Sequence, residues 1–204
     1  MRRPKTLALP ASRDRIRDSA KSLFAERGFD KTTTAAICRL AGTSQSQLIK
    51  HFVDKQGVLN AIFEEAWEQI NPAVQLATES MASPRDKLRM LIEMVLGFLE
   101  KDRALRSLFL LEGRRIRGDG QMVVLVSGFL EFVRTVDEIL EELAAKNELA
   151  GDVNPQAFRS GLMGMIEGML RDQLLSRTSK FPAVYNEADI RGVVTKFLSV
   201  CMDR

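Results

Sequence analysis

A short polar segment, AGTSQSQLIKHF at 41–52, carries the side chains best suited to recognition chemistry in this chain of 204 residues. It holds Gln45, Gln47 and Lys50 together with His51, the only histidine of the sequence. A glutamine amide can pair with N6 and N7 of adenine, serine hydroxyls are tolerant partners, and lysine reaches guanine or a phosphate. The segment therefore has the chemistry to read base edges, and the alternative is an ordinary solvated helix face.

The spacing around Gly42 predicts a tight turn between two helices. Glycine takes a left-handed conformation there without steric cost. The small side chain of Cys38 precedes it by four positions, and the apolar Leu48 follows it by six. A small residue, a glycine and an apolar residue at this spacing are typical of a helix-turn-helix motif.

The helix after the turn is predicted to begin at Ser44, which forms a capping box with the residue three positions later. Leu48 and Phe52 are four residues apart, so both can face the core. The polar side chains of this helix then point mostly outward, and we expect DNA contacts from Gln45, Ser46, Gln47 and Lys50.

Two further helices are expected before the turn. Ser12 can cap the first, which ends at Gly28. A second starts near the threonine cluster at 32–34 and runs to about residue 40, with Ile37 and Leu40 facing inward. The apolar face of the first helix is formed by Ile16, Ala20, Leu23 and Phe24.

The remainder of the chain is also predicted to be helical, which makes the fold class all-α with about nine helices. Asp54 can cap a helix of about 55–79. Sequence breakers then separate helices at roughly 85–101, 103–114, 121–147, 154–178 and 187–202.

Charge is unevenly distributed along the chain. Residues 1–60 carry twelve Lys and Arg against five Asp and Glu, a net charge of +7, although the whole chain has only +3. A positive amino-terminal part is expected to bind a polyanion, and the alternative is a solvated basic tail.

Several classes of protein are disfavoured by the sequence. The two cysteines, Cys38 and Cys201, are far apart, which argues against a disulfide framework or a metal site and favours a reduced, cytoplasmic location. The apolar stretch TLALPA is too short for a signal peptide, and no run approaches the about 18 residues of a membrane helix. With one histidine and no catalytic motif, an enzyme is not expected, and no cofactor is implied.

The segment SLFAERGFDKTTTAAICRLAGTSQSQLIKHFVDKQGVL resembles the amino-terminal signature of the TetR family of bacterial transcriptional regulators. The matching residues are Leu23, Phe24, Glu26, Gly28, Phe29, Thr33, Ile37, Ala41, Gly42, Ser44, Leu48, His51, Phe52 and Lys55. The resemblance is specific over 12–60 and rests beyond that on length and helix pattern. It implies a three-helix DNA-binding domain at 12–60 and a helical ligand-sensing and dimerisation domain at 61–204. Residues 1–11 contain two prolines and show no periodicity, so they are expected to form a flexible basic arm.

The resemblance also implies contacts with the DNA backbone. These are expected from Thr33, Thr43, His51 and Lys55, and the candidate set includes Thr34 and Ser44 beside them. Lys55 is the first choice for phosphate because it would lie at a helix N-terminus. His51 could instead be a packed histidine, and the threonines could be helix caps. Ile49 stands where the family has a tyrosine that contacts phosphate, and Ser46 where it often has glycine.

A dimer surface is expected on two of the later helices, because one short helix-turn-helix reads too little DNA alone. Three glycines on one face of the helix at 154–178, Gly161, Gly164 and Gly168, let another helix approach closely. With Val194 and Phe197 of the last helix they could form a four-helix dimer bundle, as in the family. The alternative is packing within one chain.

The central part of the chain is rich in methionine, which adapts to irregular space. By resemblance this domain encloses an inducer cavity, for which Met90, Met94, Phe98, Phe109 and Phe129 are candidate lining residues. The alternative is that these residues belong to an ordinary hydrophobic core without a cavity.

The predicted function is a homodimeric DNA-binding regulator, most simply a repressor. It would bind a palindromic operator and be released by a small, mainly apolar molecule. The helix at 55–79 would be the lever that couples the two sites. The competing interpretation is a helical ligand-binding or scaffold protein that has lost specific DNA binding, motivated by Ile49 and Ser46.

Overall fold

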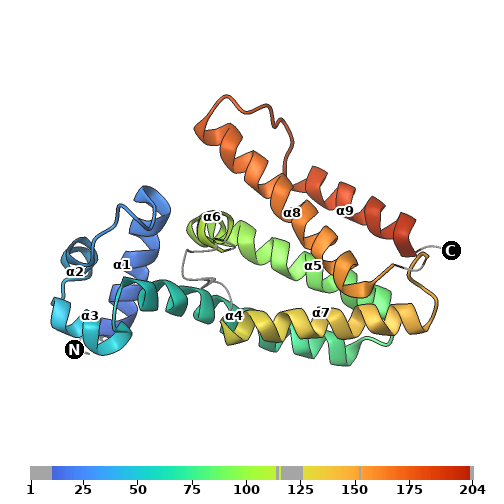
Figure 1. Ribbon diagram of the computed structural model, residues 1–204, viewed down its shortest axis with the longest axis horizontal. Coiled ribbons are helices and arrows are strands. Elements are labelled where there is room, and N and C mark those ends of the chain that lie inside the picture. The colour runs from blue at the N-terminus through green and yellow to red at the C-terminus, as the bar shows by residue number, and fades with distance from the viewer. Residues whose placement is uncertain (1–10, 114, 116–125, 152, 203–204) are drawn as a thin grey trace, which may run out of the picture.

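The computed structural model describes residues 11–113, 115, 126–151 and 153–202. The predicted basic arm lies outside these residues except for Ala11. The described part consists of nine helices without a strand, so the all-α prediction is confirmed (Figure 1). The helices are α1 Ser12–Arg27, α2 Thr34–Ala41, α3 Gln45–Phe52, α4 Lys55–Ser80, α5 Pro84–Lys101, α6 Arg103–Glu112, α7 Ser127–Ala145, α8 Pro155–Thr178 and α9 Glu187–Met202.

The first three helices and the beginning of α4 share one hydrophobic core. Its fully buried members include Ile16, Phe24, Ile37, Leu48 and Phe63. These are residues that the helical period places on inward faces.

The prediction that Leu40 faces inward is wrong, because its side chain is 58% exposed. Ile37, Cys38 and Ala41 occupy the buried face of α2 instead. Leu40 comes three residues after Ile37 and lies on the other side of it from Cys38 and Ala41, where the short helix is open to solvent. The apolar residue at the end of α2 is therefore a surface residue.

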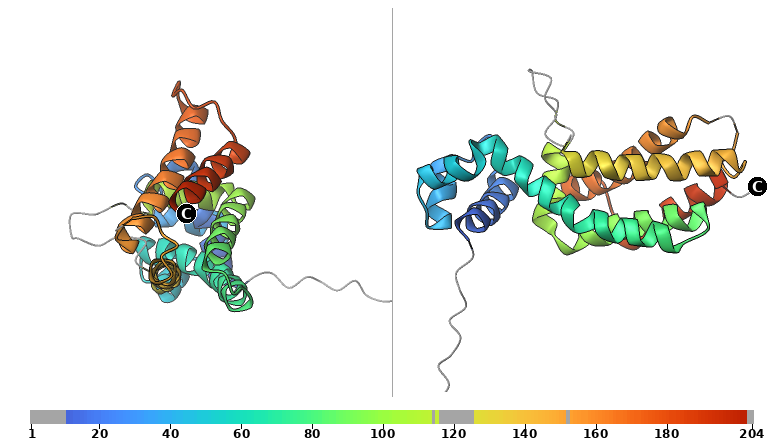
Figure 2. Two further views of the ribbon diagram at one scale, coloured as in Figure 1. Left: turned by 90° about the vertical axis from the view of Figure 1, so that its right-hand side faces the viewer. Right: turned by 90° about the horizontal axis from the view of Figure 1, so that it is seen from below.

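The long helix α4 joins the amino-terminal helices to the rest of the molecule (Figure 1 and Figure 2). Asp54 caps it through a 2.7 Å hydrogen bond from the Gly57 amide to Oδ1. Its buried residues up to Ala66 belong to the first core, whereas Trp67 and those after it belong to a second. One continuous helix thus contributes to both cores, and a domain boundary at residue 60 stays a prediction.

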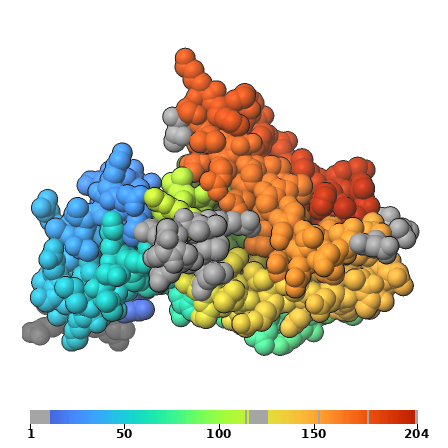
Figure 3. Space-filling view, in the orientation of Figure 1, coloured from blue at the N-terminus to red at the C-terminus, as the bar shows by residue number. Residues whose placement is uncertain are grey.

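The second core is formed by α4, α5, α7, α8 and α9, which make up the larger part of the molecule (Figure 3). Helix α6 lies between this part and α1, and contributes Leu105 and Leu108 to the first core and Leu110 to the second. Lys21 of α1 forms a 2.8 Å ion pair with Asp102, the N-cap of α6. Helix α6 is therefore tied directly to the amino-terminal helices.

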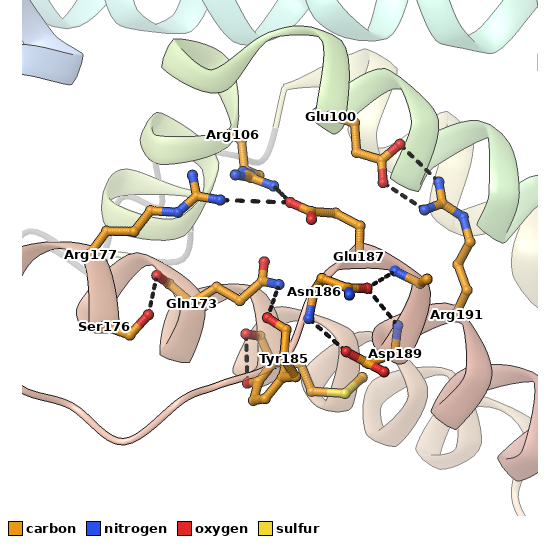
Figure 4. A network of polar contacts seen from close by, with 12 residues as sticks. Glu100, Arg106, Gln173, Ser176, Arg177, Tyr185, Asn186, Glu187, Asp189 and Arg191 are labelled. Carbon is orange, nitrogen blue, oxygen red and sulfur yellow. Dashed lines mark hydrogen bonds and ion pairs between the residues drawn. The ribbon is translucent and has the colours of Figure 1, made fainter.

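A polar network fixes α9 against α5 and α6 (Figure 4). The guanidinium of Arg191 holds Glu100 at 2.6 Å and Glu93 at 2.8 Å. Arg106 of α6, only 8% exposed, forms a 3.0 Å ion pair with Glu187 at the start of α9. Through these pairs the C-terminal helix is held by the same short helix that contacts α1.

None of the described helices is long and apolar enough to cross a membrane.

Candidate DNA interface and ligand cavity

The turn between α2 and α3 has the geometry predicted from Gly42. This residue is left-handed, with φ 59° and ψ 45°. Its amide donates to the Arg39 carbonyl at 3.3 Å, and the Thr43 amide donates to the Cys38 carbonyl at 3.0 Å. A side chain at position 42 would strain the backbone, so glycine fixes the angle between the two helices.

Both helices of the pair begin with a capping side chain. The Ser44 hydroxyl accepts a 3.3 Å hydrogen bond from the Gln47 amide, and the Thr33 hydroxyl accepts one of 3.2 Å from the Ala36 amide. The capping role expected for these residues is confirmed. Both hydroxyls remain near exposed helix N-termini, where free amides favour an anion such as phosphate.

Helix α3 turns its polar side chains away from the core, as predicted. Leu48 and Phe52 are buried at 1% and 6% exposure. Among the expected DNA-contacting residues, Gln47 is half-buried and the other members of this outer face, Gln45, Ser46 and Lys50, are exposed. The apolar Ile49 is exposed as well, at 59%. The helix therefore presents a short surface of amide, hydroxyl, ammonium and one branched apolar side chain.

Lys55 makes contacts within the chain that the sequence did not predict. Its ammonium donates to the carbonyls of Phe29 at 2.8 Å and Thr32 at 2.9 Å, and it lies 4.3 Å from the centre of the Phe29 ring. These bonds tie the α1–α2 connection to the beginning of α4. Two of the three N–H donors of the ammonium are thus engaged within the chain, and a phosphate contact of Lys55 stays a prediction beside that of the backbone amides at the α4 N-terminus.

The junction from α3 to α4 is closely constrained. Val53 has φ 69° and ψ −56°, and the Asp54 amide donates to the Phe52 carbonyl at 2.8 Å. This is a γ-turn of the rare, strained type, formed here by a β-branched residue. A Cβ on Gly57 would lie 1.9 Å from the Phe52 carbonyl oxygen. Glycine at 57 therefore allows α3 to approach α4 closely enough to hold its direction.

The second candidate site is an apolar cavity of about 160 Å³ in the larger part of the molecule. Helix α5 contributes Leu88, Leu91, Ile92, Val95 and Leu99, and α8 contributes Leu162, Met163, Ile166 and Leu170. Phe109 and Phe129 are members of the wall, in agreement with their prediction.

Met90, Met94 and Phe98 are not among the residues that line this cavity. Met90 is 39% exposed, while Met94 and Phe98 pack against the cores. The sequence shows two apolar stripes on α5, and the structure turns the leucine-rich one toward the cavity. The prediction that Met90, Met94 and Phe98 line the cavity is therefore wrong. The flexibility of a methionine side chain does not determine which side of its helix faces the cavity.

Trp67, the only tryptophan of the chain, also lines the cavity. Its backbone approaches α7 closely, since a Cβ on Gly128 would lie 2.5 Å from the Trp67 Cβ. The Asn71 side-chain amide donates to the Gly128 carbonyl at 2.9 Å and fastens this crossing. The indole NH of Trp67 is buried and has no hydrogen-bond partner among the described residues. Trp67 is therefore a lining residue whose buried indole NH is unpaired among the described residues.

Two charged residues lie in the wall, and both come from α8. Arg159 pairs with Asp137 of α7, and Glu167 pairs with Arg171 at 2.6 Å. Sequence reasoning missed them because no motif marks a charged residue on a helix that also carries many apolar ones.

The three glycines of α8 lie away from the cavity. A Cβ built on Gly161, Gly164 or Gly168 would meet no atom within 4 Å in the part of the chain that the structure describes. Close packing within one chain therefore does not account for them.

The two partners predicted on α9 need revision. Val194 is only 2% exposed and belongs to the core of its own chain, so it cannot serve as a surface contact. Phe197 is half-buried and stacks on Phe158 with ring centres 5.5 Å apart. The exposed apolar residues of α9 are Val193 at 49% and Val200 at 66%. The error is one helix position, about 100°, which sequence periodicity alone does not resolve.

Comparison with known proteins agrees with this geometry. A family model described as "Bacterial regulatory proteins, tetR family" matches residues 16–62. The HTH-type transcriptional regulator UidR of Escherichia coli strain K12 is 24% identical over 193 residues, covering 90% of this chain and 93% of that protein. The fatty acid degradation regulator FadR of Bacillus halodurans has a similar fold, with a TM-score of 0.79, 19% identity and coverage of 94% and 96%. The transcriptional regulator FadR of Bacillus subtilis, solved in complex with stearoyl-CoA, has a TM-score of 0.78 and 19% identity. The match covers 91% of this chain and 96% of that one.

Proposed function

Because the chain belongs to the TetR family of bacterial regulatory proteins, we propose that it is a cytoplasmic transcriptional repressor released from its operator by a small, mainly apolar molecule. The observation that carries the DNA-binding part is the outward polar face of α3, held at a fixed angle by Gly42 and by the α3–α4 junction. Amide and ammonium groups on a helix that is free on that side suit the major groove.

In this proposal α3 reads bases while its surroundings bind phosphate. Gln45, Ser46, Gln47 and Lys50 face the base edges. Backbone contacts come from the helix N-termini near Thr33, Thr34, Thr43 and Ser44, from His51, and from the amides at the start of α4 beside Lys55. Such contacts position the protein and give binding its salt dependence.

The active form is proposed to be a homodimer formed through α8 and α9, so that two copies of α3 read a palindromic operator. The open side of Gly161, Gly164 and Gly168 supports this arrangement, because it lets a second helix approach to short distance. On α9 the exposed Val193 and Val200 replace Val194 as contact residues.

The ligand is proposed to occupy the apolar cavity beside Trp67. An elongated hydrocarbon portion would suit the leucine-rich wall, and the similar FadR of Bacillus subtilis was solved in complex with stearoyl-CoA.

Three helices suit the coupling of ligand to DNA. Helix α8 lines the cavity with Leu162 and Ile166 while its other side carries the three glycines. Helix α6 contributes Phe109 to the wall and is tied to α1 through the pair of Asp102 with Lys21. A ligand that displaces either helix would change the separation or orientation of the two α3 helices, and therefore lower operator affinity. Helix α4, with Trp67 in the wall, is the third connection.

The test is selection of bound sequences from random DNA, followed by titration of the selected operator at several salt concentrations. We expect a palindromic consensus, a steep fall of affinity with salt, and a complex that contains an even number of chains. Recovery of no consensus, with binding that ignores sequence, would favour the alternative of a helical ligand-binding protein without specific DNA binding. The variants Gln47→Ala and Lys50→Ala then show which base positions relax.

A further inference from the structure

Ile49 is an apolar side chain exposed in the middle of a polar surface. It is 59% exposed, although Leu48 beside it is 1% exposed and completes the core contact of α3. Its neighbours on the outer side of the helix are Gln45, Ser46 and Lys50, all exposed and polar. Single exposed apolar residues are common on protein surfaces, so the informative feature of Ile49 is its place among the outward polar side chains of α3.

The position of Ile49 on α3 places it where base edges would be read. Gln45 precedes it by one helical turn, so the two side chains lie on the same side of the helix, one above the other. The helix belongs to a part of the chain with a net charge of +7 over residues 1–60, which attracts a polyanion rather than an apolar protein surface. The partner that covers Ile49 is therefore expected to be the DNA duplex itself.

The major groove offers few apolar groups, and the C5-methyl of thymine is the one on its base edges. An isoleucine has no hydrogen-bonding atom with which to bind a phosphate or a polar base edge. We propose that Ile49 packs on the methyl group of a thymine in each operator half-site and is a specificity-determining residue. This inference rests on the proposed function, since it assumes that α3 enters the major groove.

The pairing of Ile49 with Gln45 makes the inference more definite. A glutamine suits adenine, and an isoleucine suits thymine. Because the two side chains are one turn apart on one side of the helix, the bases they read are close together in the groove. The half-site is therefore expected to contain an A·T pair at the position that faces this end of α3.

The experiment replaces each thymine of the selected operator, one at a time, by deoxyuridine, which lacks only the methyl group and keeps the pairing with adenine. The dissociation constant is measured for the wild type and for Ile49→Ala. We expect one position in each half-site at which deoxyuridine weakens wild-type binding about fourfold, as for the loss of one buried methyl group. The Ile49→Ala protein should bind the thymine and deoxyuridine operators equally at that position.

Leu40→Ala is the matched control, because Leu40 is similarly exposed at 58% but lies on α2. This variant should keep the full sensitivity to deoxyuridine, and both variants should unfold at the wild-type temperature. Equal wild-type affinity for every deoxyuridine operator, or an unchanged sensitivity in Ile49→Ala, would overturn the inference while leaving the regulator intact. Absence of any sequence-specific binding by the wild type would instead overturn the proposed function and the inference with it.

Discussion

The imidazole of His51 and the hydroxyl of Ser12 are joined by a hydrogen bond of 2.9 Å between Nε2 and Oγ. The bond connects the last turn of α3 to the first residue of α1, so α1 orients the only histidine of the chain. It leaves Nδ1 for another partner. A packed histidine and a histidine that contacts phosphate are therefore compatible, because each role uses its own ring nitrogen.

Replacing Ser12 by alanine is expected to weaken operator binding about fivefold, because the loss of one hydrogen bond of about 1 kcal/mol leaves the imidazole without a fixed orientation. Fluorescence anisotropy with a labelled operator measures the effect. Ser22→Ala, an exposed position on the same helix, should leave affinity unchanged. Equal affinities for the two variants would show that the bond to Ser12 does not orient the histidine for DNA.

Val53→Gly is expected to stabilise the fold by about 1 kcal/mol, because a β-branched residue with φ 69° is strained and glycine is not. Urea unfolding followed by circular dichroism measures the change. Val53→Ala should gain less, since alanine keeps its Cβ. A loss of stability in Val53→Gly would mean that the turn costs little in the native protein.

Ligand binding is expected to change the fluorescence of Trp67, because it is the only tryptophan and lines the apolar cavity. Titration with fatty acids and acyl thioesters of increasing chain length should give a saturable change in emission. Trp67→Phe removes the signal, and a labelled operator then reports whether release still occurs. A saturable effect on operator binding without a fluorescence change would place the ligand elsewhere.

Acid is expected to weaken the attachment of α9. The guanidinium of Arg106 holds the pKa of Glu187 below its ordinary value, and that of Arg191 does the same for the pKa of Glu100. A carboxyl whose pKa is lowered by folding stabilises the protein above its unfolded pKa, about 4.3 for Glu, and this contribution is lost as the pH falls through the folded pKa.

The corresponding measurement is the free energy of unfolding between neutral and acidic pH for the wild type and for Glu187→Gln. The variant should be less stable at neutral pH and should lose less stability as the pH falls below about 4.3. Parallel curves for the two proteins would show that the pair with Arg106 contributes nothing that depends on pH.

If the proposed dimer forms through α8, Gly164→Leu is expected to convert it to monomer and to abolish operator binding at the concentrations where the wild type is saturated. The bulky side chain would separate the two copies of α8 at their closest approach. Sedimentation equilibrium measures the association. Gly97→Leu on α5 is the matched control, because a Cβ there also meets no described atom within 4 Å. A dimeric Gly164→Leu protein would contradict the assigned interface.

Most helices, most of their caps and the Gly42 turn could be predicted from the sequence because they depend on short-range rules. The prediction that Ser12 caps α1 is wrong, because Ser12 is the first residue of the helix and its hydroxyl is bonded to His51 instead of to a backbone amide. Ser44 and Asp54 cap the helices as expected, and Leu48 and Phe52 are buried at the predicted spacing. Periodicity determines an inward face wherever a helix is amphipathic on one side only.

Long-range relationships were harder to predict. The ammonium of Lys55 binds carbonyl groups, which every residue possesses and which leave no trace in the sequence. Helix α5 has two apolar stripes, and only the packed structure decides which of them faces the cavity. Val193 and Val194 are equally apolar neighbours, and their opposite exposures follow from the rotation of α9. In each case the missing information is the relative placement of elements that are distant in the chain.

The close crossing of Gly128 with Trp67 has a consequence for the size of the proposed ligand. Any residue larger than glycine at 128 would have to push α7 away from α4 or shift the indole. The glycine at 128 therefore sets how closely α7 approaches α4 beside Trp67, which lines the cavity. If the proposed effector occupies this cavity, a change in the length of effector accepted would accordingly begin at position 128, far from the proposed DNA-binding face of α3.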